Sequence, residues 1–237
     1  MTNASFVYYR SPNFGRDLNE KEFKLAAIQG INYADYFKID KTLIFNLKTT
    51  YPGLIIGAGY THPALKEGDF QLGFYFDHTT GMPVIPGSTV KGILKSVFPK
   101  KGEADEIKRE KLKYFNGLIK QITGKDTLLN DNNWGKLFEK GNIFFDAFIS
   151  AIPDNGRVFA EDYITPHKNI FKNPIPIRFL KIAPDVTFTF QFKLKDGCFK
   201  NSQKISSNEK LKLFKQILLD FGIGAKRNVG YGNLIEA

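Results

Sequence analysis

The stretch Gly222-Ile-Gly-Ala-Lys-Arg-Asn-Val-Gly-Tyr-Gly232 places four glycines around the cationic pair Lys226 and Arg227. An amphipathic stretch, Leu211 to Phe221, precedes it, and a short apolar segment, Tyr231 to Ile235, follows. The loop is therefore predicted to leave a helix and enter a strand, whereas a dinucleotide-binding glycine loop leaves a strand and opens a helix. Because glycine has no Cβ atom, the loop can still bring bare backbone and two cations close to an extended polyanion.

The helix before the loop is predicted to begin near Ser206 or Ser207, because Ser206 and Glu209 have the spacing of a capping box. Its buried face is expected to hold Leu211, Phe214, Leu218 and Phe221. Alternation of apolar and polar residues predicts strands elsewhere in the chain. The predicted strands and extended segments are Thr42–Thr49, Gln71–Phe76, Asn142–Ile149, Arg157–Ile164, Pro174–Ala183 and Val186–Lys193.

The order strand, helix, several strands, helix, strand predicts an α+β fold. We expect an antiparallel sheet with helices on one face, the ferredoxin-like (RRM-like) pattern. Residues 100–140 are charged and largely helical, and we interpret them as an insertion in a single domain spanning 1–237. The 23 phenylalanines predict an aromatic-rich core.

Composition restricts the class of protein. The net charge is +10, a balance that often accompanies binding to nucleic acid or to an anionic surface. A single cysteine, Cys198, excludes an intramolecular disulfide and a cysteine zinc cage. No signal-peptide core begins the sequence, and no apolar run approaches the ~18 residues of a membrane span. We expect a cytoplasmic protein with no membrane partner.

A second motif, Pro86-Gly-Ser-Thr-Val-Lys-Gly-Ile-Leu-Lys95, predicts a helix with Ser88 at its N-cap. Unpaired N–H groups at such a helix start attract anions, and Lys91 and Lys95 add charge. The spacing is not that of a phosphate-binding P-loop. A capped amphipathic helix with a solvated lysine face explains the same residues. Gly92 costs ~1 kcal/mol inside a helix, which a close packing contact or a ligand would justify.

The glycine loop also has a purely structural interpretation, in which Gly222 caps the helix and the later glycines form a turn or bulge. Capping alone leaves the remaining glycines and the two cations unexplained, so we favour contact with a polyanion. The RNA-binding candidates from both motifs are Ser88, Lys91, Lys95, Gly222, Gly224, Lys226, Arg227, Gly230 and Gly232.

No catalytic, metal or cofactor site is predicted. His62, His78 and His167 lack metal-ligand spacing, and the carboxylates Asp146, Asp154, Glu161 and Asp162 fit strand ends and turns as well as they fit a Mg²⁺ site. Exposed tyrosines can stack on unpaired bases. The tyrosines considered for this role are Tyr8, Tyr9, Tyr51, Tyr60, Tyr163 and Tyr231, although packing inside the protein explains most of them as well.

At these motifs the chain resembles the RAMP superfamily of CRISPR–Cas proteins. The helix start Ile85–Lys95 and the loop Gly222–Gly232 carry the resemblance to the superfamily as a whole. A further series resembles the family of sixth subunits of the Cmr module, the type III-B effector complex. That series is Phe144–Ala147, Asp162–His167, Asn173–Ile177 and Phe179-Leu180.

The resemblance implies a ferredoxin-like RAMP fold and a non-catalytic, guide-RNA-binding assembly subunit near the 3′ end of the guide. It also implies target RNA and other Cmr-type subunits (backbone, small and terminal) as partners. Asp162 and His167 match family positions but receive no chemical role. A second hypothesis is a metal-independent endoribonuclease that processes CRISPR transcripts, with His62 or His167 as the base. A third is a protein scaffold whose charge is incidental.

Overall fold

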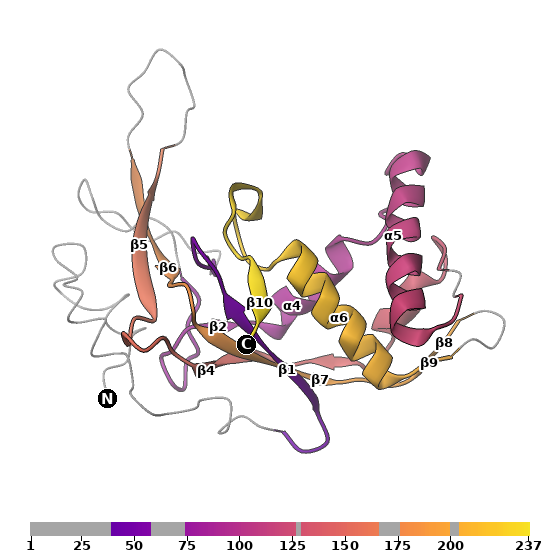
Figure 1. The fold of residues 1–237 in the computed structure, drawn as a ribbon, viewed down its shortest axis with the longest axis horizontal. Helices are drawn as coiled ribbons and strands as arrows, with labels where there is room; N and C mark the ends of the chain where they lie inside the picture. The colour runs from indigo at the N-terminus through magenta and orange to yellow at the C-terminus, as the bar shows by residue number, and fades with distance from the viewer. Residues whose placement is uncertain (1–38, 58–73, 127–128, 166–175, 200–203) are drawn as a thin grey trace, which may run out of the picture.

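The computed structural model describes residues 39–57, 74–126, 129–165, 176–199 and 204–237. Its main sheet has the strand order β10-β1-β7-β4-β2, with β3 also paired to β7, and these pairings are antiparallel. Figure 1 shows the chain as a ribbon. The strands of this sheet are β1 (Leu43–Thr49), β2 (Val84–Ile85), β3 (Ile143–Phe144), β4 (Ala147–Ala151), β7 (Thr187–Lys193) and β10 (Leu234–Glu236).

Strand β7 lies inside the main sheet, and both its apolar face and its polar face (Thr187, Thr189 and Gln191) are buried. Phe188, Phe190 and Phe192 are each at most 1% exposed. The Phe45 ring of β1 lies 5.3 Å from the rings of both Phe190 and Phe192. The predicted aromatic-rich core is therefore confirmed, and such ring pairs each add about 0.5–1.5 kcal/mol beyond area burial.

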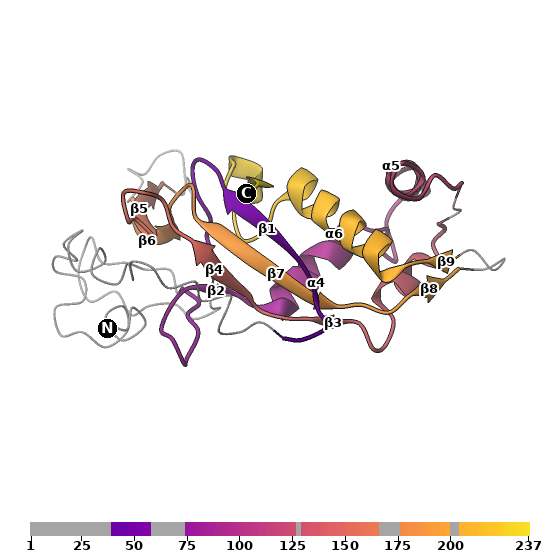
Figure 2. The same ribbon diagram turned by 60° about the horizontal axis from the view of Figure 1, so that its bottom comes forward.

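Helices α4 (Gly87–Ser96) and α6 (Ser207–Phe221) contact each other, and Figure 2 shows α6 lying along the sheet. The capping box of α6 is confirmed: Glu209 N–H donates to Ser206 Oγ (3.2 Å), and Ser206 N–H donates to Glu209 Oε2 (2.6 Å). The predicted buried face is partly wrong, because Phe221 is 37% exposed and Leu211 is half-buried. Residues Lys210, Leu213, Phe214, Ile217 and Leu218 are buried instead.

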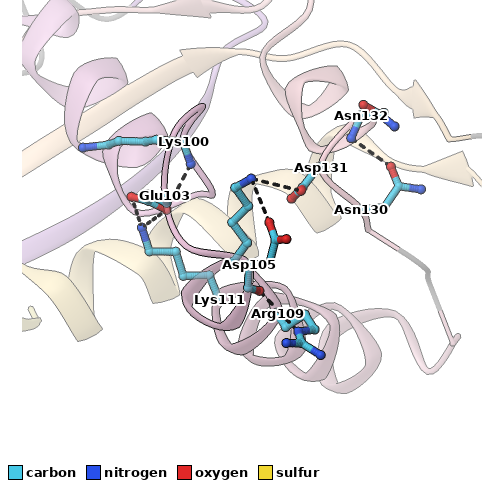
Figure 3. A network of polar contacts seen from close by, with 9 residues as sticks. Lys100, Glu103, Asp105, Arg109, Lys111, Asn130, Asp131 and Asn132 are labelled. Carbon is cyan, nitrogen blue, oxygen red and sulfur yellow. Dashed lines mark hydrogen bonds and ion pairs between the residues drawn. The ribbon is translucent and has the colours of Figure 1, made fainter.

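Helix α5 (Asp105–Thr123) and the short helix η1 (Trp134–Phe138) lie within the stretch interpreted as an insertion. The Phe98 ring stacks on Phe115 at 4.1 Å and on Trp134 at 5.1 Å, which ties α5 and η1 to the end of α4. Polar contacts fix the start of α5, among them Lys111 Nζ to Glu103 Oε1 at 2.7 Å (Figure 3). Whether 100–140 is an insertion in one domain stays a prediction.

Strands β5 (Phe159–Ile164) and β6 (Ile177–Ile182) form a separate two-stranded antiparallel sheet. In Figure 1 it stands at the opposite end of the molecule from α5. A bridge between Leu54 and Ile182 joins it to the segment after β1. The pair β8 (Gly197–Cys198) and β9 (Lys204–Ile205) forms a second small sheet. Among the described residues, no helix is long and apolar enough to span a membrane.

Candidate functional site

The glycine loop is a closed loop that links α6 to β10 through the short helix η2 (Arg227–Val229). Gly222 ends α6, and its N–H donates to Leu218 O at 3.0 Å. The N–H of Ile223 donates to Gly232 O at 2.9 Å and so closes the loop at its base. The N–H of Gly232 donates to Gly53 O at 2.8 Å, which fastens the loop to the segment after β1.

Three of the loop glycines are needed for contacts inside the protein. A Cβ atom on Gly232 would overlap Ile223 O, and one on Gly222 would lie 2.5 Å from Gly232 O. A Cβ on Gly224 would lie 2.5 Å from Ile55 O. All three have positive φ, which disfavours other residues. Gly230 also has positive φ (97°), but its Cβ would come no closer than 3.7 Å to Pro52 Cδ. Contact between these glycines and RNA stays a prediction.

Lys226 and Arg227 differ in what their side chains do. Arg227 Nη1 donates to Phe221 O at 2.9 Å, so the guanidinium satisfies a carbonyl at the end of α6. Lys226 has φ 57° and ψ 34°, the left-handed conformation that side-chain-bearing residues rarely adopt. Within the described residues its ammonium makes no ion pair. Lys226 is therefore the cation of the loop that remains available to a ligand.

The second motif forms α4, but its cap is not Ser88. Pro86 occupies the N-cap position, the helix begins at Gly87, and no side chain of the first turn caps it. The anion there is the protein's own: Gly87 N–H donates to Asp146 Oδ1 at 2.7 Å. The prediction for Ser88 as N-cap is wrong, because a carboxylate 59 residues away in the sequence supplies the cap. Ser88 is exposed in the first turn.

Lys91 and Lys95 extend from α4 over aromatic rings. Lys91 Nζ lies 5.6 Å from the centroid of the Phe144 ring, and Lys95 Nζ lies 5.8 Å from that of Phe138. Such contacts contribute roughly 0.5–1 kcal/mol at exposed sites. They direct both ammonium groups toward β3 and η1. A role for these two lysines in binding a ligand stays a prediction.

A pocket of about 240 Å³ brings the two sequence motifs together. Thr89 of α4 and Ile85 of β2 form one side, and Gly224 and Ala225 of the glycine loop form another. Lys91 and Lys95 do not line it. The segment after β1 closes the remaining side, so the pocket joins three stretches that are distant in sequence. The other lining residues are Leu54, Ile56, Gly57 and Ile223.

Both motifs fall within a match to a known family, since the model of the RAMP superfamily matches residues 46–235. The chain belongs to the RAMP superfamily. It is also 28% identical over 234 residues to the "CRISPR system CMR subunit Cmr6" of Saccharolobus solfataricus, and the alignment covers 92% of this chain and 69% of that protein. The resemblance to the superfamily expected from the sequence is confirmed.

Solved structures of related proteins include a chain of the type III-B Cmr-beta bound to cognate target RNA, studied by cryo-EM. Its identity to this RAMP protein is 26% and the TM-score is 0.52; the match covers 83% of this chain and 58% of that one. The protein thus spans less than two thirds of the length of that relative. The crystal structure of Cmr6 from Pyrococcus furiosus matches with 22% identity and a TM-score of 0.48, covering 83% of this chain and 98% of that one.

A network around Asp162 connects the β5–β6 sheet of this RAMP protein to its glycine loop. Asp162 Oδ2 accepts from Lys181 Nζ (2.5 Å) and from the Tyr231 hydroxyl (2.7 Å). Tyr231 is 8% exposed, and its ring lies 5.8 Å from that of Phe179. The sequence assigned no role to Asp162. In the structure it holds Tyr231, the residue between Gly230 and Gly232. Stacking on a base is excluded for Tyr231 by this burial but remains open for Tyr51, which is 85% exposed.

Two opposing effects set the pKa of Asp162. Burial raises it, but hydrogen bonds from Lys181, Tyr231 and the Tyr163 N–H outweigh burial and hold the pKa below its ordinary value. Burial and the adjacent Asp162 carboxylate raise the pKa of Tyr231. The phenol therefore remains protonated, as a donor to the carboxylate must.

Replacing Asp162 by Asn should make stability less dependent on pH. A carboxyl with a depressed pKa contributes stability above its unfolded pKa of ~3.9 and loses that contribution as pH falls through the folded value. We expect Asp162→Asn to be less stable than the wild type near pH 7, with the difference shrinking below about pH 4. Urea unfolding at a series of pH values measures this. Asp154→Asn, in the turn before β5, is the matched control. A difference that stays constant with pH would contradict the assignment.

Gly92 in α4 has no packing contact to justify it. It is exposed, and a Cβ atom built on it meets nothing within 4 Å. The sequence offered two explanations for a glycine at this position, a close packing contact or a ligand. For the described residues, the packing contact is wrong. A ligand that approaches α4 remains as a proposal.

Gly92→Ala should stabilise the isolated protein by about 0.8–1 kcal/mol, because alanine restricts the unfolded chain and favours helix. The melting temperature should then rise by roughly 2–4 °C. Gly117→Ala in α5, which is equally exposed and open, is the matched control and should give the same rise. If RNA or a subunit lies against Gly92, only Gly92→Ala should also weaken that binding. If the melting temperature fell for Gly92→Ala but not for Gly117→Ala, the space around Gly92 could not be open.

The remaining polar candidates are paired, exposed or outside the described residues. Glu161 pairs with Arg178, whose Nε donates to Oε2 at 2.8 Å. His78 is exposed in a turn, while His62 and His167 lie outside the described residues, as do Tyr8, Tyr9 and Tyr60. In the part of the chain that is described, no three His, Cys, Asp or Glu side chains gather as metal ligands.

Sequence reasoning missed two contributors to the site. Asp146 was considered as a metal ligand or as a strand-end or turn carboxylate, but not as the cap of α4. The segment Gly53–Gly57 was not singled out, although it forms a wall of the pocket and accepts hydrogen bonds from the glycine loop through Gly53 O and Ile55 O. The apolar run Leu54-Ile55-Ile56 between Gly53 and Gly57 was the sequence signal that could have identified this segment.

Proposed function

We propose that this chain is a non-catalytic, guide-RNA-binding assembly subunit of a type III-B CRISPR RNA-guided effector complex, located near the 3′ end of the guide. The observation that carries the proposal is the meeting of the glycine loop and the start of α4 at one pocket, where Lys226 directly follows the lining residue Ala225 in the sequence. A cation and exposed backbone held on a rigid frame grip phosphates without reading sequence. Specificity for a target then comes from base pairing to the guide.

The fold supports this role through its connectivity. We propose that β1, α4, β4, β7, α6 and β10 form the ferredoxin-like core, because their order along the chain and their sheet order β10-β1-β7-β4 are those of a split βαβ pair. In this arrangement the loop after α6 and the start of α4 lie side by side. Helix α5 and η1 are then an insertion in the core.

The proposed partners are guide RNA, target RNA and other Cmr-type subunits of backbone, small and terminal type. The similarity to Cmr6 and to a chain of Cmr-beta bound to target RNA supports them. We propose that the protein needs no cofactor and acts in the cytoplasm. The alternative of a metal-independent endoribonuclease gains no support from His78, and it predicts cleavage of repeat RNA that resists chelator and is lost in His62→Ala or His167→Ala.

Native affinity purification from the source cells tests the proposal. Short CRISPR-derived guides that co-purify with other Cmr-type subunits are the expected result. Free protein, or unprocessed repeat transcripts without such subunits, would overturn the assignment.

A further inference from the structure

We infer that the pocket between α4 and the glycine loop seats one unpaired base of the bound guide RNA. The inference rests on the proposed function and deepens it, because it adds a base contact to a site so far described as a grip on the phosphate backbone.

The size of the pocket limits its occupant. Its volume is about 240 Å³, and sites for small molecules usually measure ~300–1,000 Å³. A single ring system therefore fits, whereas a whole nucleotide with its phosphate does not. The sugar and phosphate of a seated base must remain outside, at the mouth of the pocket.

The walls of the pocket suit the flat faces of a base. Leu54, Ile56, Ile85 and Ile223 are each at most 3% exposed, so they form an apolar floor. Gly57 and Ala225 are exposed and lie at the mouth. Bases taken out of a stack are held in this way, between apolar side chains with a few polar groups at their edges.

Thr89 supplies a polar group for the edge of the base. It is half-buried, it lines the pocket, and its hydroxyl makes no hydrogen bond with another described residue. A hydroxyl both donates and accepts, so it tolerates any of the four bases. We therefore expect the pocket to accept a base by shape, with little preference for its identity.

The cation that follows Ala225 in the sequence favours RNA over a side chain of a neighbouring subunit. Lys226 directly follows Ala225, and its ammonium makes no ion pair among the described residues. A lysine side chain at residue 226 is long enough to reach a phosphate held at the mouth beside Ala225. An apolar side chain of another protein would fill the pocket equally well but would leave this cation without a partner.

Guides that carry 2-aminopurine at one position at a time, loaded into the reconstituted complex, test the inference. In the wild type, one position should show fluorescence unlike that of its neighbours. Ala225→Leu fills the pocket from its mouth and keeps the N–H that donates to Ile55 O at 3.0 Å. It should abolish the difference and weaken guide binding by about fivefold to a hundredfold, the range of one lost base contact. Thr89→Phe fills the pocket from α4, so the test does not depend on one variant folding.

Asn228→Leu is the matched control, because Asn228 is exposed in the same loop and does not line the pocket. It should leave the fluorescence pattern unchanged. If the wild-type complex retains no guide, the proposed function fails. If the guide is retained and both filled variants give the wild-type pattern at every position, the base pocket is wrong and the proposed function stands. Loss of a neighbouring subunit from the filled variants, with guide fluorescence unchanged, would assign the pocket to a protein side chain and overturn the inference.

Discussion

Gly232→Ala should unfold the glycine loop and lower the melting temperature by roughly 8–16 °C, which corresponds to a destabilisation on the order of 4 kcal/mol. Two effects add. The φ of 78° costs a residue with a side chain about 1–2 kcal/mol. The new methyl group also overlaps the carbonyl of Ile223, whose own N–H donates to Gly232 O at the base of the loop. Neither the backbone of Ile223 nor that of Gly232 can move away without breaking the hydrogen bond between them.

Gly230→Ala separates these two effects. It has a similar φ, 97°, but its Cβ would lie 3.7 Å from its nearest neighbour. It should therefore cost only the conformational part, or about 2–8 °C in melting temperature. Scanning calorimetry on both variants makes the comparison. Equal losses would show that the loop shifts easily and that the close approach of Gly232 to Ile223 does not matter for stability.

Elements whose signals are local in sequence were predicted well. The alternation in β7 identifies the phenylalanines of its apolar face, although the polar face is buried as well. The pair Ser206 and Glu209 marks the start of α6 within one turn. The start of α4 was placed wrongly because its cap comes from Asp146. The burial of Lys210, which is 1% exposed, was equally invisible, because a lysine in an amphipathic pattern is expected to face water.

The candidate site could be predicted only in part, for a physical reason. A glycine permits close approach whether the approaching atom belongs to a ligand or to the protein itself. Sequence alone therefore could not show that Gly222, Gly224 and Gly232 face internal carbonyls. Nor could it separate Lys226 from the adjacent Arg227, since their difference depends on the position of Phe221 O. The role of Asp162 required contacts with Lys181 and Tyr231 across two other elements.

Lys226→Ala should weaken guide binding about tenfold or more while leaving the fold intact. A charge-assisted hydrogen bond to phosphate is worth about 1.5–3 kcal/mol, and 1.4 kcal/mol is a factor of ten. One lost contact to single-stranded RNA should also reduce the slope of log affinity against log salt by about 0.7. Stability should not fall, because alanine adopts the left-handed conformation of residue 226 no less readily than lysine does.

The neighbouring cation should behave differently. Arg227→Ala removes the donor to Phe221 O and should cost about 1 kcal/mol, or roughly 2–4 °C in melting temperature. Its effect on the salt slope should be smaller than that of Lys226→Ala. The two substitutions change the net charge equally, so their difference separates a cation that contacts a ligand from one that supports a helix end.

Two further variants show whether the effect of Lys226 is specific. Lys226→Arg keeps the charge and should restore most of the affinity, since phosphate accepts from either cation. Lys113→Ala removes an equal charge from the exposed surface of α5 and should change neither the affinity by more than about twofold nor the slope. Binding isotherms at several salt concentrations, on protein of matched melting temperature, measure all of these. An unchanged affinity and slope in Lys226→Ala would remove the glycine loop from the RNA interface. An equal loss in Lys113→Ala would mean that the net charge of +10, rather than the position of Lys226, attracts the RNA.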